Sequence, residues 1–253
     1  MGKLGGVPEL SHDLPVPGRA LAVAAHPDDV EFRCGATLAR WATAGCEITH
    51  VICTDGSKGT WDPSADLEDL VARRREEQIA ASFALGGSGV VEFLGRIDGE
   101  LSSDTDTRRL VARAIRRHRP DVVLGHDPWK RYRLHPDHRH AGWLVVDGVV
   151  AARDPHFHPE LDEEPHRPSV LLLFEADEPD HLETATEWSL ARRCAALECH
   201  ESQFETTHLH RLGDGRDPAT LDAFRARERA KLAEMGAIGG VELAEAFKKI
   251  DDL

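Results

Sequence analysis

The chain has no run of about 20 apolar residues, which is the length that a helix needs to cross a bilayer. Its N-terminal residues lack a basic stretch followed by an apolar core, so no secretory signal peptide is visible. The cysteines are odd in number and form no CxxC pair, which argues against a disulfide framework. These absences favour a reduced, cytoplasmic protein that has no membrane partner.

Basic residues are in the minority, since 31 Lys and Arg oppose 45 Asp and Glu and give a formal net charge of −14. Binding to nucleic acid needs a surplus of cations to neutralise phosphates, so the composition argues against a nucleic-acid partner. It equally disfavours docking on anionic lipid. The length of 253 residues favours one large α/β domain, with two small domains as the alternative, and is compatible with a homo-oligomer.

Short apolar segments alternate with longer amphipathic ones along the chain. The apolar segments carry few charges, as is typical of strands covered on both faces, and span residues 20–25, 47–53, 90–94, 121–126 and 169–175. Helical patterns span residues 31–44, 67–85, 105–118, 184–200 and 217–235. The alternation predicts βαβ units and a Rossmann-like three-layer sandwich, in which helices cover both faces of a mainly parallel sheet.

The remaining segments are predicted to lie outside this pattern. Residues 1–18 are expected to form an extended arm, and residues 236–253 a C-terminal tail for which a helix is one option. Residues 54–66 and 153–168 have the composition of loops. No G-x-G-x-x-G follows the first predicted strand, so the dinucleotide-binding fingerprint is absent.

The most informative patterns are two histidine-containing motifs, His26-Pro27-Asp28-Asp29 and His135-Pro136-Asp137-His138. Each follows a predicted strand, and open α/β sheets bind their ligands at the carboxyl ends of strands. Either motif alone could simply be the start of a helix. Together they offer imidazoles and carboxylates for a catalytic divalent ion, which takes three protein ligands and keeps one position for water.

Geometry limits which residues of these motifs share one ion. Adjacent side chains point in different directions, so one of Asp28 and Asp29 should bind the ion while the other faces the water. Residues three apart on a helix share a face, so one of His135 and His138 should bind while the other stands beside the open position.

The motifs resemble those of the PIG-L/LmbE-like zinc-dependent de-N-acetylases, a family that includes deacetylases of the mycothiol and bacillithiol pathways and of N-acetylglucosamine conjugates. The resemblance covers about residues 20–205. Beside the two motifs it rests on Ala25, Val30-Glu31, Arg74-x-x-Glu77, Leu85-Gly86, Phe93-Leu94-Gly95, Asp98-Gly99-Glu100-Leu101 and His200-x-Ser202-Gln203.

The resemblance implies a role for each member of the centre. His26, Asp29 and His138 would bind Zn²⁺, although the same ligands would accept Fe²⁺. Asp28 would be the general base that takes a proton from the water at the metal. His135 would stabilise the developing charge or protonate the leaving amine.

The resemblance also assigns residues around the centre. Asp137 is expected to hydrogen-bond to His135 and fix its tautomer. Arg74 and Asp98 match positions that hold sugar hydroxyls in relatives that act on glycans. From the residues alone, Arg74 could instead pair with Glu77 along a solvated helix face.

One departure from the family concerns the residue that would polarise the acyl carbonyl. Some relatives carry a tyrosine two positions before the first histidine of the second motif, and this chain has Arg133 there. Tyr132, the single tyrosine of the chain, lies one residue earlier. Either residue, or neither, takes the role.

The function that the resemblance implies is hydrolysis of the N-acetyl group of a small-molecule N-acetylated sugar or its conjugate. An amidase that cleaves a larger acyl group from a thiol-sugar conjugate or another amide uses the same chemistry and is the nearest alternative. A metal- or sugar-binding module without catalysis is the third possibility. The spare acid Asp28 and the spare imidazole His135 argue against it, because such a module would not need them.

Overall fold

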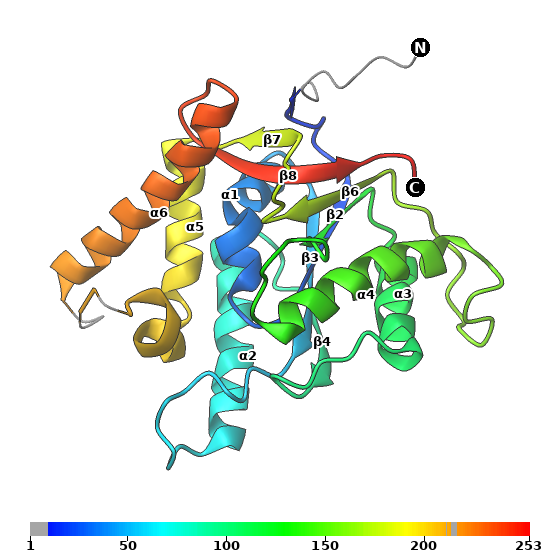
Figure 1. Cartoon of the computed structure of the whole chain (residues 1–253), viewed down its shortest axis with the longest axis horizontal. Coiled ribbons are helices and arrows are strands. Elements are labelled where there is room, and N and C mark those ends of the chain that lie inside the picture. The colour runs from blue at the N-terminus through cyan, green and yellow to red at the C-terminus, as the bar shows by residue number, and fades with distance from the viewer. Residues whose placement is uncertain (1–9, 211, 214–216) are drawn as a thin grey trace.

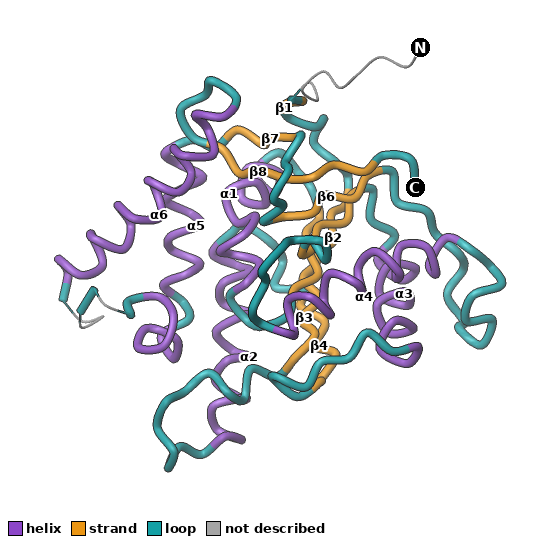
Figure 2. Tube along the Cα trace, viewed as in Figure 1, coloured by secondary structure: helices purple, strands orange, loops and turns teal. Residues whose placement is uncertain are grey.

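Strands and helices alternate along the chain in the computed structural model, which describes residues 10–210, 212–213 and 217–253 (Figures 1 and 2). The strands of this part of the chain form one sheet in the order β1-β7-β8-β6-β5-β2-β3-β4. They are β1 (Ser11–His12), β2 (Arg19–Ala24), β3 (Glu47–Thr54), β4 (Val91–Arg96), β5 (Val122–His126), β6 (Val170–Phe174), β7 (His181–Thr184) and β8 (Ala244–Ile250). All pairs are parallel except those that β8 makes with β6 and β7.

Helices cover both faces of this sheet and complete the predicted three layers. Figure 1 shows α1, α2, α5 and α6 on one side and α3 and α4 on the other. Their bounds are α1 (Asp29–Thr43), α2 (Leu67–Ala84), α3 (Thr105–His118), α4 (Pro136–Arg153), α5 (Glu187–Glu198) and α6 (Pro218–Ile238). A 3₁₀ turn (Glu201–Gln203) and a π-helical turn (Phe204–His208) follow α5. The predicted fold class is confirmed.

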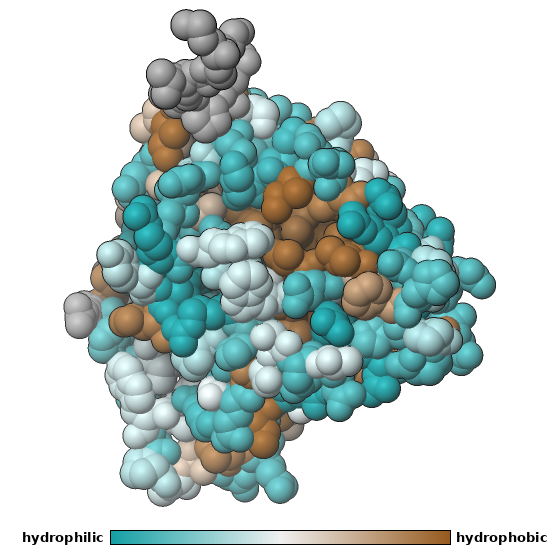
Figure 3. Space-filling model, turned by 45° about the vertical axis from the view of Figure 1, so that its right-hand side comes forward, coloured by the Kyte–Doolittle hydropathy of each residue, from teal (hydrophilic) through white to brown (hydrophobic). Residues whose placement is uncertain are grey.

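Strand β2 shows why the sheet is buried on both faces. Ala20, Ala22 and Ala24 face the apolar core under α1, whereas Leu21 and Val23 face the core under α3 and α4. Period-2 alternation therefore places apolar side chains on both faces, and the strand is a continuous apolar run in the sequence. The outer surface is predominantly hydrophilic in the view of Figure 3, with an apolar patch near its centre.

The predictions for the two ends of the chain need correction. The segment 236–253 is not a simple tail, because α6 continues to Ile238 and β8 then enters the sheet between β6 and β7. Of the predicted arm 1–18, residues 1–9 lie outside the described residues, and Ser11–His12 form β1 beside β7. β7 takes the first residue, Thr184, of the predicted helix 184–200.

The last strand also supports the first helix. α1 is interrupted at Cys34, whose backbone is not helical (φ −144°). The buried Glu245 of β8 accepts hydrogen bonds from the N–H groups of Ala36 and Thr37, at 3.0 and 2.8 Å, and so caps the second part of α1.

The topology fixes where a site can form. From β2 the chain runs outward through β3 and β4, whereas β5 and β6 lie on the other side of β2. The carboxyl ends of β2 and β5 thus flank a topological switch point, the usual position of a ligand crevice in an α/β sheet. No described helix combines the length and the apolar character that spanning a membrane would require.

Candidate active site

The first motif forms the turn between β2 and α1. Asp29 begins α1, and its carboxylate Oδ2 accepts a hydrogen bond from the backbone N–H of His26 at 2.9 Å. Asp28 has a left-handed backbone (φ 96°), which is uncommon for a residue other than glycine. This turn presents His26, Asp28 and Asp29 at the switch point, where all three side chains are buried or nearly so.

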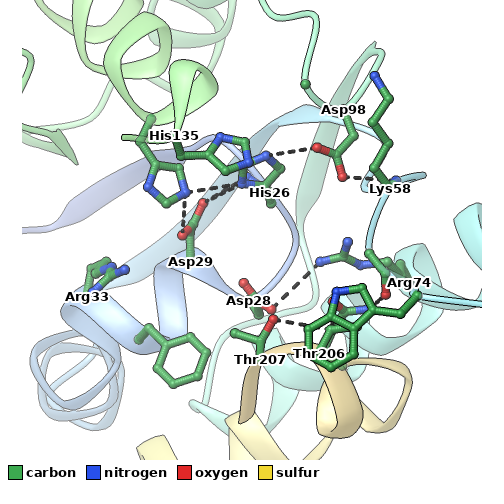
Figure 4. Close-up of a pocket in the computed structure, with 16 residues that line it drawn as sticks. His26, Asp28, Asp29, Arg33, Lys58, Arg74, Asp98, His135, Thr206 and Thr207 are labelled. Carbon is green, nitrogen blue, oxygen red and sulfur yellow. Dashed lines mark hydrogen bonds and ion pairs between the residues drawn. The ribbon is translucent and has the colours of Figure 1, made fainter. Parts of the chain in front are cut away.

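The second motif forms the start of α4 and meets the first. His135 lies at the N-cap, Pro136 is the first helical residue, and Asp137 and His138 follow in the first turn. The Nε2 atom of His138 lies 3.2 Å from Nδ1 of His26 and 3.3 Å from Oδ1 of Asp29. Figure 4 shows His135 of the second motif beside His26 and Asp29 of the first.

The donor atoms of these three side chains, with both carboxylate oxygens of Asp29 counted, lie close enough together for one small divalent ion. Nδ1 of His26 and Oδ2 of Asp29 are 3.2 Å apart, close to the two distances from His138. Tetrahedral zinc with bonds of 2.0–2.1 Å separates its ligand atoms by about 3.3 Å. The fit therefore supports His26, Asp29 and His138 as a ligand set.

Other histidines and aspartates gather around the same point. Three groups place their ligand atoms within 4.8 Å of one another: His26, His135 and His138; Asp29, His126 and His138; and His26, Asp98 and Asp137. The geometry of the described residues thus offers several candidate triads that share His26 or His138.

Asp137 is hydrogen-bonded to a different histidine than the sequence predicts. Its Oδ2 atom lies 3.2 Å from Nε2 of His26, and its carboxylate accepts the N–H groups of Gly99 (2.6 Å) and Leu101 (3.2 Å). The expected bond to His135 is therefore wrong. Asp137 instead orients His26, whose other nitrogen, Nδ1, then faces Asp29 and His138.

His26 lies among carboxylates. Burial alone would lower its pKa, but hydrogen bonds to Asp137, Asp29 and Asp98 raise that pKa well above the usual value. A buried imidazole with this many acidic partners favours a positive charge at the site. The chemistry of the donor set is consequently that of a cation site.

Asp28 is a spare acid beside this triad. Burial raises the pKa of its carboxyl to about 6, in opposition to the Arg74 guanidinium, whose Nη2 atom lies 3.7 Å away. No donor among the described residues hydrogen-bonds to this carboxylate. A buried carboxyl with a raised pKa is suited to exchange protons near neutral pH.

His135 is a spare imidazole at the exposed side of the same point. Its ring centroid lies 4.6 Å from that of His26 and 5.0 Å from that of His138. Burial and the charge of His26 lower its pKa. The ring can therefore be neutral at pH 7 and donate one N–H hydrogen bond.

Arg74 and Asp98 line the pocket but are also bound by the protein. Arg74 donates to the carbonyl oxygens of Pro27 (2.7 Å) and Gly56 (2.8 Å), so it does not pair with Glu77. Asp98 lies 3.3 Å from Nε2 of His26 and accepts the N–H of Lys58 at 3.1 Å. A guanidinium has five N–H donors, which leaves Arg74 able to bind a further acceptor.

Glu77 has partners of its own. It pairs with Arg73 (3.0 Å) and accepts hydrogen bonds from the backbone and hydroxyl of Ser202, at 2.9 and 2.6 Å. The matching segments Arg74-x-x-Glu77 and His200-x-Ser202-Gln203 therefore meet in space. This contact fixes the 3₁₀ turn that carries Gln203 to the pocket wall.

Of the two candidates for polarising the carbonyl, neither lines the pocket. The Tyr132 side chain is 93% exposed. Nη1 of Arg133 lies 3.3 Å from Nδ1 of His138 and 2.5 Å from a carboxylate oxygen of Glu175. Arg133 thus contacts the back of a candidate ligand.

Sequence reasoning missed His126 and Glu175. His126 ends β5, is fully buried, and stacks on the His138 ring at 4.5 Å. Its position at a strand end was the signal that could have found it. Glu175 follows β6 and pairs with Arg33 of α1 and with Arg133 of the loop before α4. Because these partners are distant in the sequence, no local pattern could have predicted its role.

A cavity of about 350 Å³ is lined on one side by His26, Asp28, Asp29, His135 and His138. Its wall away from the histidines comes from the loop after β3 and from the turns after α5, and includes Trp61, Gln203, Thr206 and Thr207. Most of the lining residues are polar, and Phe32 and Trp61 add apolar surface. Such a pocket suits a hydroxyl-rich ligand.

The structure thus combines a three-layer α/β fold with a cluster of histidines and aspartates at its switch point. The model of the PIG-L family, described as GlcNAc-PI de-N-acetylase, matches residues 21–149, a range that includes both motifs. The diacetylchitobiose deacetylase of Thermococcus kodakarensis is 32% identical over 191 residues, which are 74% of this chain and 70% of that protein. The chain belongs to the PIG-L family of de-N-acetylases.

Two further comparisons agree with this assignment. The 1D-myo-inositol 2-acetamido-2-deoxy-alpha-D-glucopyranoside deacetylase of Streptomyces avermitilis is 36% identical over 168 residues, 56% of each chain. The alignment thus spans little more than half of that relative. The structure of N,N'-diacetylchitobiose deacetylase from Pyrococcus horikoshii with its inhibitor has a TM-score of 0.81 at 26% identity, over 93% of this chain and 84% of that chain.

Proposed function

We propose that this chain removes the acetyl group from an N-acetylated amino sugar, free or in a conjugate, with one divalent ion held by His26, Asp29 and His138. The observation that carries the proposal is the close spacing of the donor atoms. His26 Nδ1 and His138 Nε2 lie 3.2 Å apart, and each lies 3.2–3.3 Å from one of the two carboxylate oxygens of Asp29. Asp28 and His135 stand beside that triad outside the ligand set. Zn²⁺ fits this spacing, and Fe²⁺ would accept the same ligands.

When bound, the ion would polarise the acyl carbonyl and lower the pKa of a water molecule toward neutrality. Asp28 accepts the proton that the attacking water loses, because burial raises the pKa of this carboxyl to about 6. A base whose pKa lies near the working pH is the most effective one. The attack breaks the amide C–N bond and yields acetate and a free amine.

His135 acts on the substrate atoms that acquire charge. Its ring lines the same pocket as Asp28, at its exposed side. An N–H donor at this place can stabilise negative charge on the carbonyl oxygen, which is worth about 3–4 kcal/mol per donor in acyl transfer. The leaving nitrogen receives the proton that Asp28 took from the water. The His135 ring can relay that proton by accepting it on one nitrogen as it releases the N–H of the other, so the ring is neutral before and after the step.

The substrate class follows from the pocket and from the relatives. Asp98, Lys58, Gln203, Thr206 and Thr207 supply acceptors and donors for sugar hydroxyls. The named relatives act on diacetylchitobiose and on an acetamido-glucopyranosyl inositol. We therefore assign Arg74 and Asp98 to sugar binding, and expect a substrate in which N-acetylglucosamine is linked to a second polar group.

The decisive experiment offers the purified chain a panel of N-acetylglucosamine, diacetylchitobiose, an N-acetylglucosaminyl inositol and matched amides with larger acyl groups. Acetate and primary amine are measured with the native metal, after chelation, and after addition of Zn²⁺ or Fe²⁺. We expect acetate release that disappears on chelation and returns with the metal. Release of only larger acyl groups would identify an amidase, and metal binding without any turnover would contradict the proposal.

A further inference from the structure

Two side chains of α2 hold the peptide bond between Pro27 and Asp28. Arg74 Nη2 donates to the carbonyl oxygen of Pro27 at 2.7 Å, and the side-chain oxygen of Gln78 accepts the N–H of Asp28 at 2.9 Å. Arg74 and Gln78 are one helical turn apart and share a face of α2. They therefore contact the two ends of one peptide plane.

That peptide plane decides where the Asp28 carboxylate lies. On its other side, the Asp28 carbonyl oxygen accepts the first hydrogen bond of α1, from Phe32 N–H at 3.1 Å. With that carbonyl fixed, the orientation of the preceding peptide sets φ of Asp28, which is 96°. A left-handed backbone costs an L-residue about 1–2 kcal/mol, so the conformation persists only where neighbours enforce it.

Gln78 is itself held in place at both polar ends of its side chain. It is fully buried. Its amide nitrogen donates to Glu31 Oε1 at 2.8 Å and lies 3.2 Å from Nδ1 of the buried His50. The amide cannot rotate without losing these partners, so its oxygen is directed at the N–H of Asp28.

From these contacts we propose that Gln78 is a positioning residue, which acts through Asp28 by holding its strained backbone in the conformation that directs the carboxylate into the pocket. The inference rests on the proposed function for its effect on turnover. The contact itself is independent of which substrate is cleaved. Arg74 shares the task, but it also lines the pocket, so Gln78 is the cleaner residue to test.

The test compares Gln78→Leu and Gln78→Met, which remove both polar atoms at similar size, with Ser82→Ala. Ser82 is buried on the same face of α2, one turn farther from Asp28, and is the matched control. Amide hydrogen exchange of Asp28 is measured by NMR, and kcat, KM and metal content are measured on the metal-loaded enzyme. Each change is repeated in an Asp28→Asn background.

We expect slow exchange at the Asp28 amide in the native chain and in Ser82→Ala, and exchange at least tenfold faster in the Gln78 variants. We expect kcat to fall about 10- to 100-fold, with KM within about twofold and metal content unchanged. In the Asp28→Asn background the Gln78 changes should lower the rate by less than about twofold, because residues that act as a unit are not additive.

Fast exchange of the Asp28 amide in the native chain would overturn the proposal, whether or not the variants fold. So would native-like exchange in folded Gln78 variants, or an equal loss of rate with and without the Asp28 carboxylate. If the native chain cleaves nothing in the panel, the proposed function fails. The exchange data still decide whether Gln78 holds Asp28.

Discussion

Asp28 and Asp137 occupy the same place in two motifs that share the letters His-Pro-Asp, yet their surroundings give them opposite properties. Burial by itself would raise the pKa of both carboxyls. At Asp137 this effect is outweighed by hydrogen bonds from His26, Gly99 and Leu101, and the pKa is lowered. Asp28 receives no such bonds from the described residues, and its pKa is about 6. The groups that donate to a carboxylate, and not the motif, decide whether it orients a neighbour or exchanges protons.

The largest expected effect separates the two aspartates by turnover. Replacement of Asp28 with asparagine should lower kcat by about 10²–10⁴-fold, because it removes the proposed general base. Metal content, measured by elemental analysis, should stay at the native value, because Asp28 lies outside the ligand triad. A variant that loses its metal would contradict the assigned role.

The same change at Asp137 should act on the metal instead. Asp137→Asn weakens the hydrogen bond that orients His26, and loss of such partners costs about 10- to 100-fold in metal affinity. Competition with a chromophoric chelator measures this directly. At saturating metal, kcat should stay within about tenfold of the native value. A loss of kcat as large as that of Asp28→Asn would remove the distinction between the two aspartates.

His208, a buried histidine outside both motifs, should make the free energy of unfolding depend on pH. Burial lowers the pKa of His208 well below its usual value, and the nearby His200 adds to the shift. The unfolded chain therefore binds a proton that the folded chain excludes once the pH falls below about 6.5. Below that pH, the free energy of unfolding should decrease as the pH decreases. This group contributes up to about 1.4 kcal/mol per pH unit.

His208→Phe should remove that part of the slope, because phenylalanine cannot bind a proton. The new ring should fit, because the imidazole already packs against Phe32 and Phe224. Urea denaturation at pH 7.5 and 5.5 measures the difference. The exposed His156 provides the control substitution, His156→Phe, for which we expect the native slope. An unchanged slope in His208→Phe would mean that other groups cause the acid sensitivity.

The smallest expected effect concerns the two backbones. Asp28→Gly should be more stable than Asp28→Ala by about 1 kcal/mol, because glycine relieves the left-handed conformation. Asp137 lies in the first turn of α4, so there the order should reverse, with glycine less stable than alanine by about 0.5–1 kcal/mol. Thermal unfolding of the four variants checks both signs. A glycine variant no more stable than the alanine variant at position 28 would show that Asp28 is not strained.

Much of the fold could be predicted from the sequence because its signals are local. Strands such as β2 and β5 are buried on both faces and appear as continuous apolar runs. β8 could not be found this way. It carries Lys248 and Lys249, and its pairing with β6 and β7 is decided by partners distant in the sequence.

The candidate site divides in the same way. The motifs predicted which side chains meet, and the structure brings His26, Asp29 and His138 together, although their roles stay predictions. The partner of Asp137 was wrong, because the bond to His26 joins residues 111 positions apart. Gln78 and Glu175 have no recognisable pattern, since each matters only through contacts that folding creates.

The cap that Glu245 places on α1 joins one of the first helices to be synthesised to the last strand of the chain. The first motif leaves the ribosome early, yet the helix that begins at Asp29 receives this support from a side chain 209 residues after Ala36. Nascent chains that stop short of β8 therefore lack an anchor for that helix. We expect the capped part of α1 to be anchored only once β8 has joined the sheet.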